Sequence, residues 1–235
     1  MKSRVFDVLR AIFFPPRCAG CAVPLETGVL CAACAGSIAI ARTLFCGQCD
    51  ARLFGDKVLC HPEYPYVLGS PTLYANIAVQ ALVRSLKFGR RRAAAEPLVV
   101  LMKEYCSSLG NLFTDALVIP IPLSRRRLRA RGFNQAELLA RPLAGFLNLP
   151  FDASSFVRVR HTKPQTETKS AALRRENLRG CFAVRGRGAV TGRRILLVDD
   201  VTTTGTTFLE AARTLKAAGA ETIFALAVAK VPVVQ

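Results

Sequence analysis

Six residues near the carboxyl terminus, 195–200, constrain the fold more than any other segment. They begin with Ile195-Leu196-Leu197-Val198, a continuous apolar run, which is typical of a strand buried on both faces of a parallel sheet. Asp199 and Asp200 follow directly. Because ligands of open α/β sheets bind at the carboxyl ends of strands, these two acids are candidate binding residues. We therefore expect a strand over residues 193–198 that ends at a ligand site.

The residues after the acids, 201–207, form a Thr- and Gly-rich turn that leads into an expected helix. Backbone N–H groups of such a turn converge on an anion, and the helix N-terminus adds partial positive charge. Adjacent carboxylates can accept hydrogen bonds from a diol or help to hold Mg²⁺. A Walker A loop and a dinucleotide fingerprint are excluded, because the turn has neither Gly-Lys-Ser/Thr nor G-x-G-x-x-G. A Thr-rich helix cap alone would leave the paired acids unexplained.

The segments after residue 66 alternate between helical and strand patterns. Pro142 should kink or split one of the helices. Strands that alternate with helices predict an α/β fold, in which helices cover both faces of a parallel sheet. The expected helices are 74–88, 97–107, 134–147 and 206–218, and the expected strands are 116–120, 193–198 and 222–229.

Basic side chains are concentrated in the second part of the chain. Residues 67–235 contain 26 Lys and Arg against 11 Asp and Glu, whereas residues 1–66 contain 7 against 5. This excess favours an anionic partner, either a nucleic acid or a polyphosphate. Phe88 and Phe133 adjoin basic residues and could stack on bases, although burial is the simpler interpretation of each.

Two basic segments are candidates for binding that anion. Residues 125–131 follow the expected strand at 116–120 and are interpreted as a loop, whose guanidinium groups suit a diphosphate or a nucleic-acid backbone. Residues 158–179 are interpreted as a mobile loop that closes over the site and leads into a charged helix over 170–178; an ordinary surface loop is the alternative. The candidate anion-binding residues are Arg125, Arg126, Arg127 and Lys163.

Seven of the nine cysteines lie between residues 18 and 60. Two Cys-x-x-Cys pairs are separated by nine residues, which is the spacing of a four-cysteine structural zinc site. These ligands are Cys18, Cys21, Cys31 and Cys34. Three further thiolates, Cys46, Cys49 and Cys60, can serve a second ion, or the pairs interleave.

The chain divides after the cysteines. Residues 61–66 contain two prolines and suit an extended linker, so we predict a zinc-finger module over 1–66 and a second domain over 67–235. The apolar stretch at 1–16 is interrupted by Asp7 and Arg10, lacks a cleavage site and is far shorter than the ~20 apolar residues of a membrane span. We interpret it as a short amphipathic helix and expect a cytoplasmic protein; contact with the inner face of the membrane is the alternative.

The apolar strand, the two acids and the Thr-Gly-x-Thr turn resemble the signature of type I phosphoribosyltransferases. By this resemblance Asp199 and Asp200 hold the ribose 2′ and 3′ hydroxyls of phosphoribosyl diphosphate, which binds with Mg²⁺. The residues that would cradle the 5′-phosphate are Thr203, Thr204, Gly205, Thr206 and Thr207.

Further segments extend the resemblance to the ComF (competence protein F) family over nearly the whole chain. They are Pro-x-Pro at 120–122 before the arginine run, Arg-Gly-Phe-Asn-Gln at 131–135, Lys-Pro-Gln-Thr at 163–166, Asn-Leu-Arg-Gly-x-Phe at 177–182 and the cysteine module. A fourth Cys-x-x-Cys is common in this family. Glu63 occupies its second position here, so a second zinc site would need His61 or another ligand beside Cys46, Cys49 and Cys60.

The ComF resemblance implies a cytoplasmic protein that serves DNA uptake in natural transformation. Its expected ligands are phosphoribosyl diphosphate or a nucleotide, and single-stranded DNA, with other DNA-uptake proteins as further partners. The alternative is an active phosphoribosyltransferase of nucleotide or related metabolism. The sequence identifies neither a general base nor an acceptor segment, so it leaves enzymatic activity open.

Overall fold

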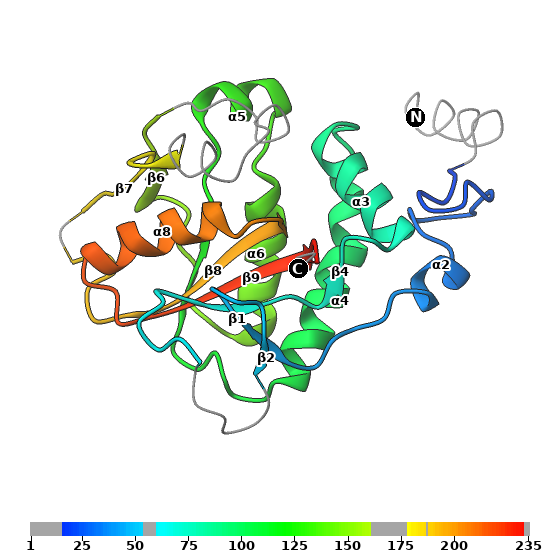
Figure 1. Ribbon diagram of the computed structural model, residues 1–235. Coiled ribbons are helices and arrows are strands. Elements are labelled where there is room, and N and C mark those ends of the chain that lie inside the picture. Colours follow the sequence, from blue (N-terminus) through cyan, green and yellow to red (C-terminus); the bar gives the residue numbers. More distant parts are fainter. Residues whose placement is uncertain (1–15, 54–59, 161–177, 187, 233–235) are drawn as a thin grey trace.

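The computed structural model describes residues 16–53, 60–160, 178–186 and 188–232, and a seven-stranded sheet lies at its centre (Figure 1). The strand order is β2-β1-β3-β9-β8-β5, and β4 also pairs with β9. Strands β3, β4, β9, β8 and β5 run parallel, whereas β1 and β2 are antiparallel additions at one edge. The strands are β1 Leu44–Cys46, β2 Arg52–Leu53, β3 Val67–Gly69, β4 Thr72–Leu73, β5 Leu117–Pro120, β8 Arg194–Thr202 and β9 Thr222–Lys230.

Helices cover both faces of this sheet, as the sequence predicts (Figure 1). Successive residues of β8 point to opposite faces. Leu196 and Val198 pack with α3, α4 and α6, whereas Ile195 and Leu197 pack with α8. The helices are α2 Ala32–Gly36, α3 Ile77–Lys87, α4 Ala95–Ser108, α5 Arg125–Arg131, α6 Gln135–Leu147 and α8 Thr206–Ala217, with a 3₁₀ turn at Arg92–Ala94.

The structure corrects two expectations about helices. Pro142 does not split helix α6, which continues through it as one element, because Leu139, Leu143 and their neighbours on one face are buried and offset the loss of one hydrogen bond. A kink at Pro142 stays a prediction. The arginine run is not a loop but helix α5. The Ser124 hydroxyl accepts the N–H of Arg127 at its start, and Gly132 ends it with φ of 83°.

The cysteine-rich segment and the sheet are continuous. Leu44 of β1 pairs with Gly69 of β3, and Phe45 pairs with Leu68. The sheet therefore extends across residue 66, and the domain boundary at that point stays a prediction. No helix in the described ranges is long and apolar enough to cross a membrane. Residues 1–15, Lys163 and most of the expected charged helix at 170–178 lie outside the described residues.

A second, two-stranded sheet stands beside the first. Strands β6 (Phe156–Arg158) and β7 (Phe182–Val184) are antiparallel, and Phe156 stacks on Phe182 with ring centroids 5.0 Å apart. Both rings belong to the apolar cluster that α8 covers. This small sheet positions the basic residues that flank the segment 161–177.

Candidate functional site

The two acids lie at the carboxyl end of β8, which continues to Thr202 rather than ending before them. Asp199 is 9% exposed and Asp200 is 2% exposed. The Asp200 Oδ1 atom accepts the N–H of Val201 at 2.7 Å and lies 2.9 Å from Lys87 Nζ. The other carboxylate oxygen of Asp200, Oδ2, is buried and has no hydrogen-bond partner among the described residues. A buried, unpaired oxygen is costly, so a hydrogen-bond donor from outside the described residues would stabilise this atom.

Lys87 is a member of this site that sequence reasoning missed. It is the last residue of α3, and its side chain is 25% exposed. Burial alone would lower the pKa of Lys87, but the charges of Asp200 and Asp199 outweigh burial and raise it. Burial and then the charge of Asp200 raise the pKa of Asp199 to about 7, although Lys87 opposes the shift. The protein thus supplies a cation, Lys87, beside the acid pair.

The turn that follows connects the acids to α8. Thr203 and Thr204 are exposed, Thr206 is buried, and Thr204 Oγ1 lies 2.7 Å from Thr206 Oγ1. Gly205 has φ of 67°, a conformation that favours glycine, and forms the N-cap of α8. Asp199 and residues 201–208, which include Thr207, line one small hollow here. The hollow therefore brings Asp199 together with all five predicted phosphate ligands, whereas Asp200 is not among its lining residues. The turn has the form of an anion site.

Tyr66, another residue that sequence reasoning missed, lies behind the turn. Its hydroxyl is 3.4 Å from the Gly205 carbonyl oxygen and 3.4 Å from the Gly47 carbonyl oxygen. A Cβ atom on Gly205 would come within 2.5 Å of the Tyr66 hydroxyl. The sequence placed Tyr66 only in a Pro-rich linker, and no local pattern indicates the contact.

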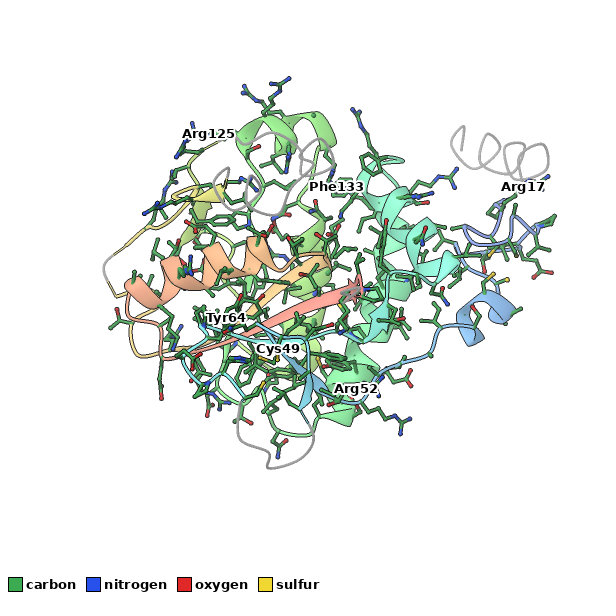
Figure 2. All side chains as sticks on the ribbon, viewed as in Figure 1. Arg17, Cys49, Arg52, Tyr64, Arg125 and Phe133 are labelled. Carbon is green, nitrogen blue, oxygen red and sulfur yellow. The ribbon has the colours of Figure 1, made fainter. Side chains whose placement is uncertain are left out.

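A second hollow of about 400 Å³ lies beside α5, and we call it the arginine pocket. Figure 2 places the Arg125 side chain at the end of the molecule opposite Cys49 and Tyr64. Arg127 is not among the lining residues, and Lys163 lies outside the described residues. The pocket is lined by Ser124, Arg125, Arg126, Arg129, Arg158, Val159, Arg160 and Arg185.

The arginine pocket is thus more basic than the sequence alone predicts. Arg158 and Arg160 come from β6 and its continuation, and Arg185 directly follows β7. Arg158 lies over the Phe182 ring at 5.5 Å, and burial lowers its pKa. Burial lowers the pKa of Arg131, at the end of α5, while the charges of Asp200 and Asp199 oppose that shift. Arg131 itself is not among the residues that line the arginine pocket.

The cysteines form two separate groups rather than interleaving. Cys18, Cys21, Cys31 and Cys34 form the first cysteine cluster, and in it all ligand atoms lie within 4.8 Å of one another. The Cys21 and Cys31 sulfurs are 3.7 Å apart, close to the roughly 3.8 Å edge of a tetrahedron with Zn–S bonds of about 2.3 Å. Burial raises the pKa of Cys18, but backbone N–H groups, first that of Cys31, lower it to about 6. This set of thiols can hold a metal ion.

Cys46, Cys49, Cys60 and His61 form the second cysteine cluster, with the same 4.8 Å limit. The Cys49 and Cys60 sulfurs are 3.5 Å apart, and Cys46 Sγ lies 3.4 Å from His61 Nδ1. The backbone N–H of Ala51, followed by Cys60, lowers the pKa of Cys49 to about 7. These residues fit a second metal ion, and His61 stands where a fourth thiolate would otherwise be needed.

Comparisons with known proteins agree with this arrangement. The phosphoribosyl transferase domain family matches residues 129–232. The chain is 33% identical over 215 residues to the DNA utilization protein YhgH of Escherichia coli O157:H7, across 83% of this chain and 93% of that protein. It is 30% identical over 222 residues to competence protein F of Haemophilus influenzae, across 90% of this chain and 95% of that protein. The chain belongs to the ComF family.

A further ComF relative matches a smaller part of this chain. Competence protein ComFC of Bacillus subtilis is 32% identical over 126 residues, which cover 53% of this chain and 49% of that protein. The phosphoribosyl transferase match in this ComF-family chain begins in α5 and ends just after β9. It therefore includes the acid pair and the turn, but neither Lys87 nor the two cysteine clusters.

Proposed function

We propose that this chain is a competence protein that serves DNA uptake, and that its phosphoribosyltransferase-type domain binds phosphoribosyl diphosphate. The observation that carries the ligand is the buried acid pair at the end of β8, where Asp200 Oδ2 has no partner among the described residues. The names of the relatives, DNA utilization protein and competence protein F, support the process.

The proposed binding mode follows from the chemistry of the two parts. Asp199 and Asp200 accept hydrogen bonds from the ribose 2′ and 3′ hydroxyls, while residues 203–207 and the N-terminus of α8 hold the 5′-phosphate. A protein that bound only DNA phosphates would have no use for adjacent carboxylates, because they repel phosphate. Mg²⁺ bound with the diphosphate would supply neutralising charge there.

Calorimetric titration with phosphoribosyl diphosphate and Mg²⁺ tests the ligand. We expect saturable binding by the wild type and a loss of at least about tenfold in the Asp199→Asn, Asp200→Asn double variant, since two charged hydrogen-bond acceptors are removed. Glu137→Gln is the control, because Glu137 is an acid on α6 that pairs with Arg141. Absence of binding by the folded, metal-loaded wild type would exclude this ligand and leave DNA binding as the function of the domain.

We further propose that the arginine pocket binds the backbone of single-stranded DNA. Six guanidinium groups line it, and the excess of basic residues after position 66 would attract a polyanion. Phe88 is 75% exposed beside Lys87, so the burial interpretation is wrong for it and a base could stack on its ring, whereas Phe133 is buried as expected.

Salt dependence tests the DNA proposal. Each phosphate that is neutralised should contribute about −0.7 to the slope of log K against log salt for a single strand. The Arg125→Gln, Arg129→Gln variant should reduce this slope, whereas Arg213→Gln, on the exposed side of α8, should not. A flat plot for the wild type would contradict electrostatic binding.

Active phosphoribosyl transfer is the second candidate, and the six arginines of the arginine pocket, which suit a departing diphosphate, favour it. In this reaction, Arg131 and the arginine pocket would stabilise the departing diphosphate while the two acids steady the ribose as positive charge develops on it. Release of diphosphate from phosphoribosyl diphosphate during a screen of amine acceptors would demonstrate the activity. The double Asp→Asn variant is the negative control.

We also propose zinc as the metal of both cysteine clusters, with a structural role, because each cluster presents four protein ligands and no open position. Metal analysis of the purified protein should find two equivalents of zinc. The proposed location is the cytoplasm, where thiols remain reduced and available to metal; contact with the inner face of the membrane is the alternative. Other DNA-uptake proteins are proposed as further partners.

A further inference from the structure

The ribose end of the proposed site contains a cation that belongs to the protein. Lys87 projects from the last turn of α3, and its Nζ atom is 2.9 Å from Asp200 Oδ1. The same oxygen also accepts the Val201 N–H at 2.7 Å. One oxygen of Asp200 is therefore fully engaged, while Oδ2 has no partner among the described residues.

Electrostatics explains why the two carboxylate oxygens of Asp200 differ in their partners. Two buried carboxylates that follow one another repel each other and also repel an anionic ligand. A buried carboxylate that served only in an ion pair would be expected to have both oxygens satisfied, because an unpaired buried acceptor is costly. Asp200 instead has its charge balanced at one oxygen and an acceptor left over at the other.

We propose that Lys87 is the built-in counter-ion of the acid pair, so that the ribose 5-phosphate part of the ligand binds without a divalent cation. This proposal rests on the proposed function. Lys87 pairs with one oxygen of Asp200 and fixes the orientation of the carboxylate, and Asp200 Oδ2 then accepts a hydrogen bond from a ribose hydroxyl. The divalent cation serves only the diphosphate part of the complete ligand. Lys87 is thus a positioning residue for the sugar.

The experiment is calorimetric titration with ribose 5-phosphate, in excess chelator and in Mg²⁺. The wild type should bind with affinities that agree within about threefold in the two buffers. Lys87→Met keeps the aliphatic stem and removes the charge, and it should weaken binding in chelator by about tenfold or more, the range expected for a charged hydrogen bond. Added Mg²⁺ should restore part of the loss in this variant alone.

Two further variants separate local from general effects. Lys103→Met removes the same charge from α4, where Lys103 lies over the Phe146 ring, and it should bind like the wild type. Lys87→Arg keeps the charge and should bind within about threefold of the wild type, since a cation remains beside Asp200. Thermal unfolding of each variant shows whether it is folded. The comparison between chelator and Mg²⁺ uses only the wild type, so it does not depend on the folding of any variant.

The outcomes distinguish this proposal from the function on which it rests. Binding of phosphoribosyl diphosphate with Mg²⁺, together with ribose 5-phosphate binding that requires Mg²⁺, would overturn the role of Lys87 and leave the proposed function intact. Unchanged binding by a folded Lys87→Met variant in chelator would also overturn it. Failure of the wild type to bind either ligand would overturn both.

Discussion

The two cysteine clusters use nearly the same ligands, but they are connected to the rest of the molecule in different ways. The first cysteine cluster packs against the start of α3: a Cβ atom on Gly20 would lie 3.3 Å from that of Ala78, and the Asn76 amide donates to the Ser37 carbonyl at 3.1 Å. Helix α3 leads from this cluster to Lys87 beside the acid pair, and its 11 residues span about 16 Å at a rise of about 1.5 Å each.

Cys46 of the second cysteine cluster lies in the sheet, and Tyr66 links the cluster to the turn at residues 201–207. Cys46 pairs with Val67 of β3, and the Gly47 carbonyl and the Gly205 carbonyl lie on either side of the Tyr66 hydroxyl. Asp50 pairs with Lys230, the last residue of β9, at 2.5 Å. Equal coordination chemistry thus does not imply equal surroundings: the first cluster packs against one helix, while the second adjoins Tyr66, which contacts the turn before α8.

Loss of one ligand from each cluster should give the largest difference. Cys49→Ser should remove one metal equivalent, lower the melting temperature by about 10 °C and weaken phosphoribosyl diphosphate binding by about tenfold through the loss of the Gly47 support. Cys21→Ser is the matched variant, because Cys21 is also exposed; it should remove one equivalent and change the affinity by less than about twofold. Metal analysis measures the metal content of each variant, and calorimetry measures its ligand affinity. Equal losses of affinity in the two variants would contradict the proposed difference between the clusters.

The Lys230–Asp50 pair is the next largest effect. The Lys230 side chain is 8% exposed and lies 3.7 Å from the centre of the Phe45 ring. Lys230→Met should lower the free energy of unfolding by about 3 kcal/mol, because Asp50 loses its partner. The Lys230→Met, Asp50→Asn double variant should recover most of this loss. Urea denaturation provides the measurement, and a double variant as unstable as the single one would contradict the pairing.

A methyl group at Gly205 tests the contact between Tyr66 and the turn. Gly205→Ala should cost about 1–2 kcal/mol of unfolding free energy, since φ is positive and the new Cβ would meet the Tyr66 hydroxyl at 2.5 Å. Gly110→Ala is the control, because its φ is +62° and a Cβ there meets nothing within 4 Å. Ligand affinity should fall only in Gly205→Ala, and Tyr66→Phe in the same chain should restore part of it.

Removal of single hydroxyl groups should have the smallest effects. Tyr66→Phe should lower the free energy of unfolding by at most about 1 kcal/mol and weaken ligand binding by about threefold. Tyr105→Phe removes a shorter bond, 2.6 Å to the Thr43 carbonyl, so it should destabilise the protein at least as much while leaving affinity unchanged. An effect of Tyr105→Phe on affinity would mean that general softening, and not the contact at Gly205, controls the turn.

Sequence reasoning succeeded where chemistry and spacing are local. The acids and the turn are contiguous, so strand, acids and helix start could be predicted together. The membership of the first cysteine cluster follows from two short pairs.

The arginine run is an exception among the local features. Ser124 and Gly132 are typical of the start and end of a helix, but the arginine-rich composition favoured a loop.

The remaining features depend on contacts between distant segments. Lys87 resembles any solvated lysine at the end of an amphipathic helix, and only the packing of α3 brings it to Asp200. The arginine pocket likewise needs the pairing of β6 with β7 to add Arg158, Arg160 and Arg185. Phe88 and Phe133 have similar sequence surroundings, but Phe133 is buried beneath Arg92 while Phe88 extends from the end of α3.

The hairpin of β1 and β2 also keeps β3 from being an exposed sheet edge that could pair with another copy of the chain. It covers β3, whose backbone donors and acceptors would otherwise form an open edge that templates pairing between chains. A chain shortened to begin at residue 62 would lose this cover together with Asp50, leaving the ammonium of Lys230 without its carboxylate. Such a truncation would invite aggregation, so the cysteine-rich segment protects the solubility of the fold that follows it.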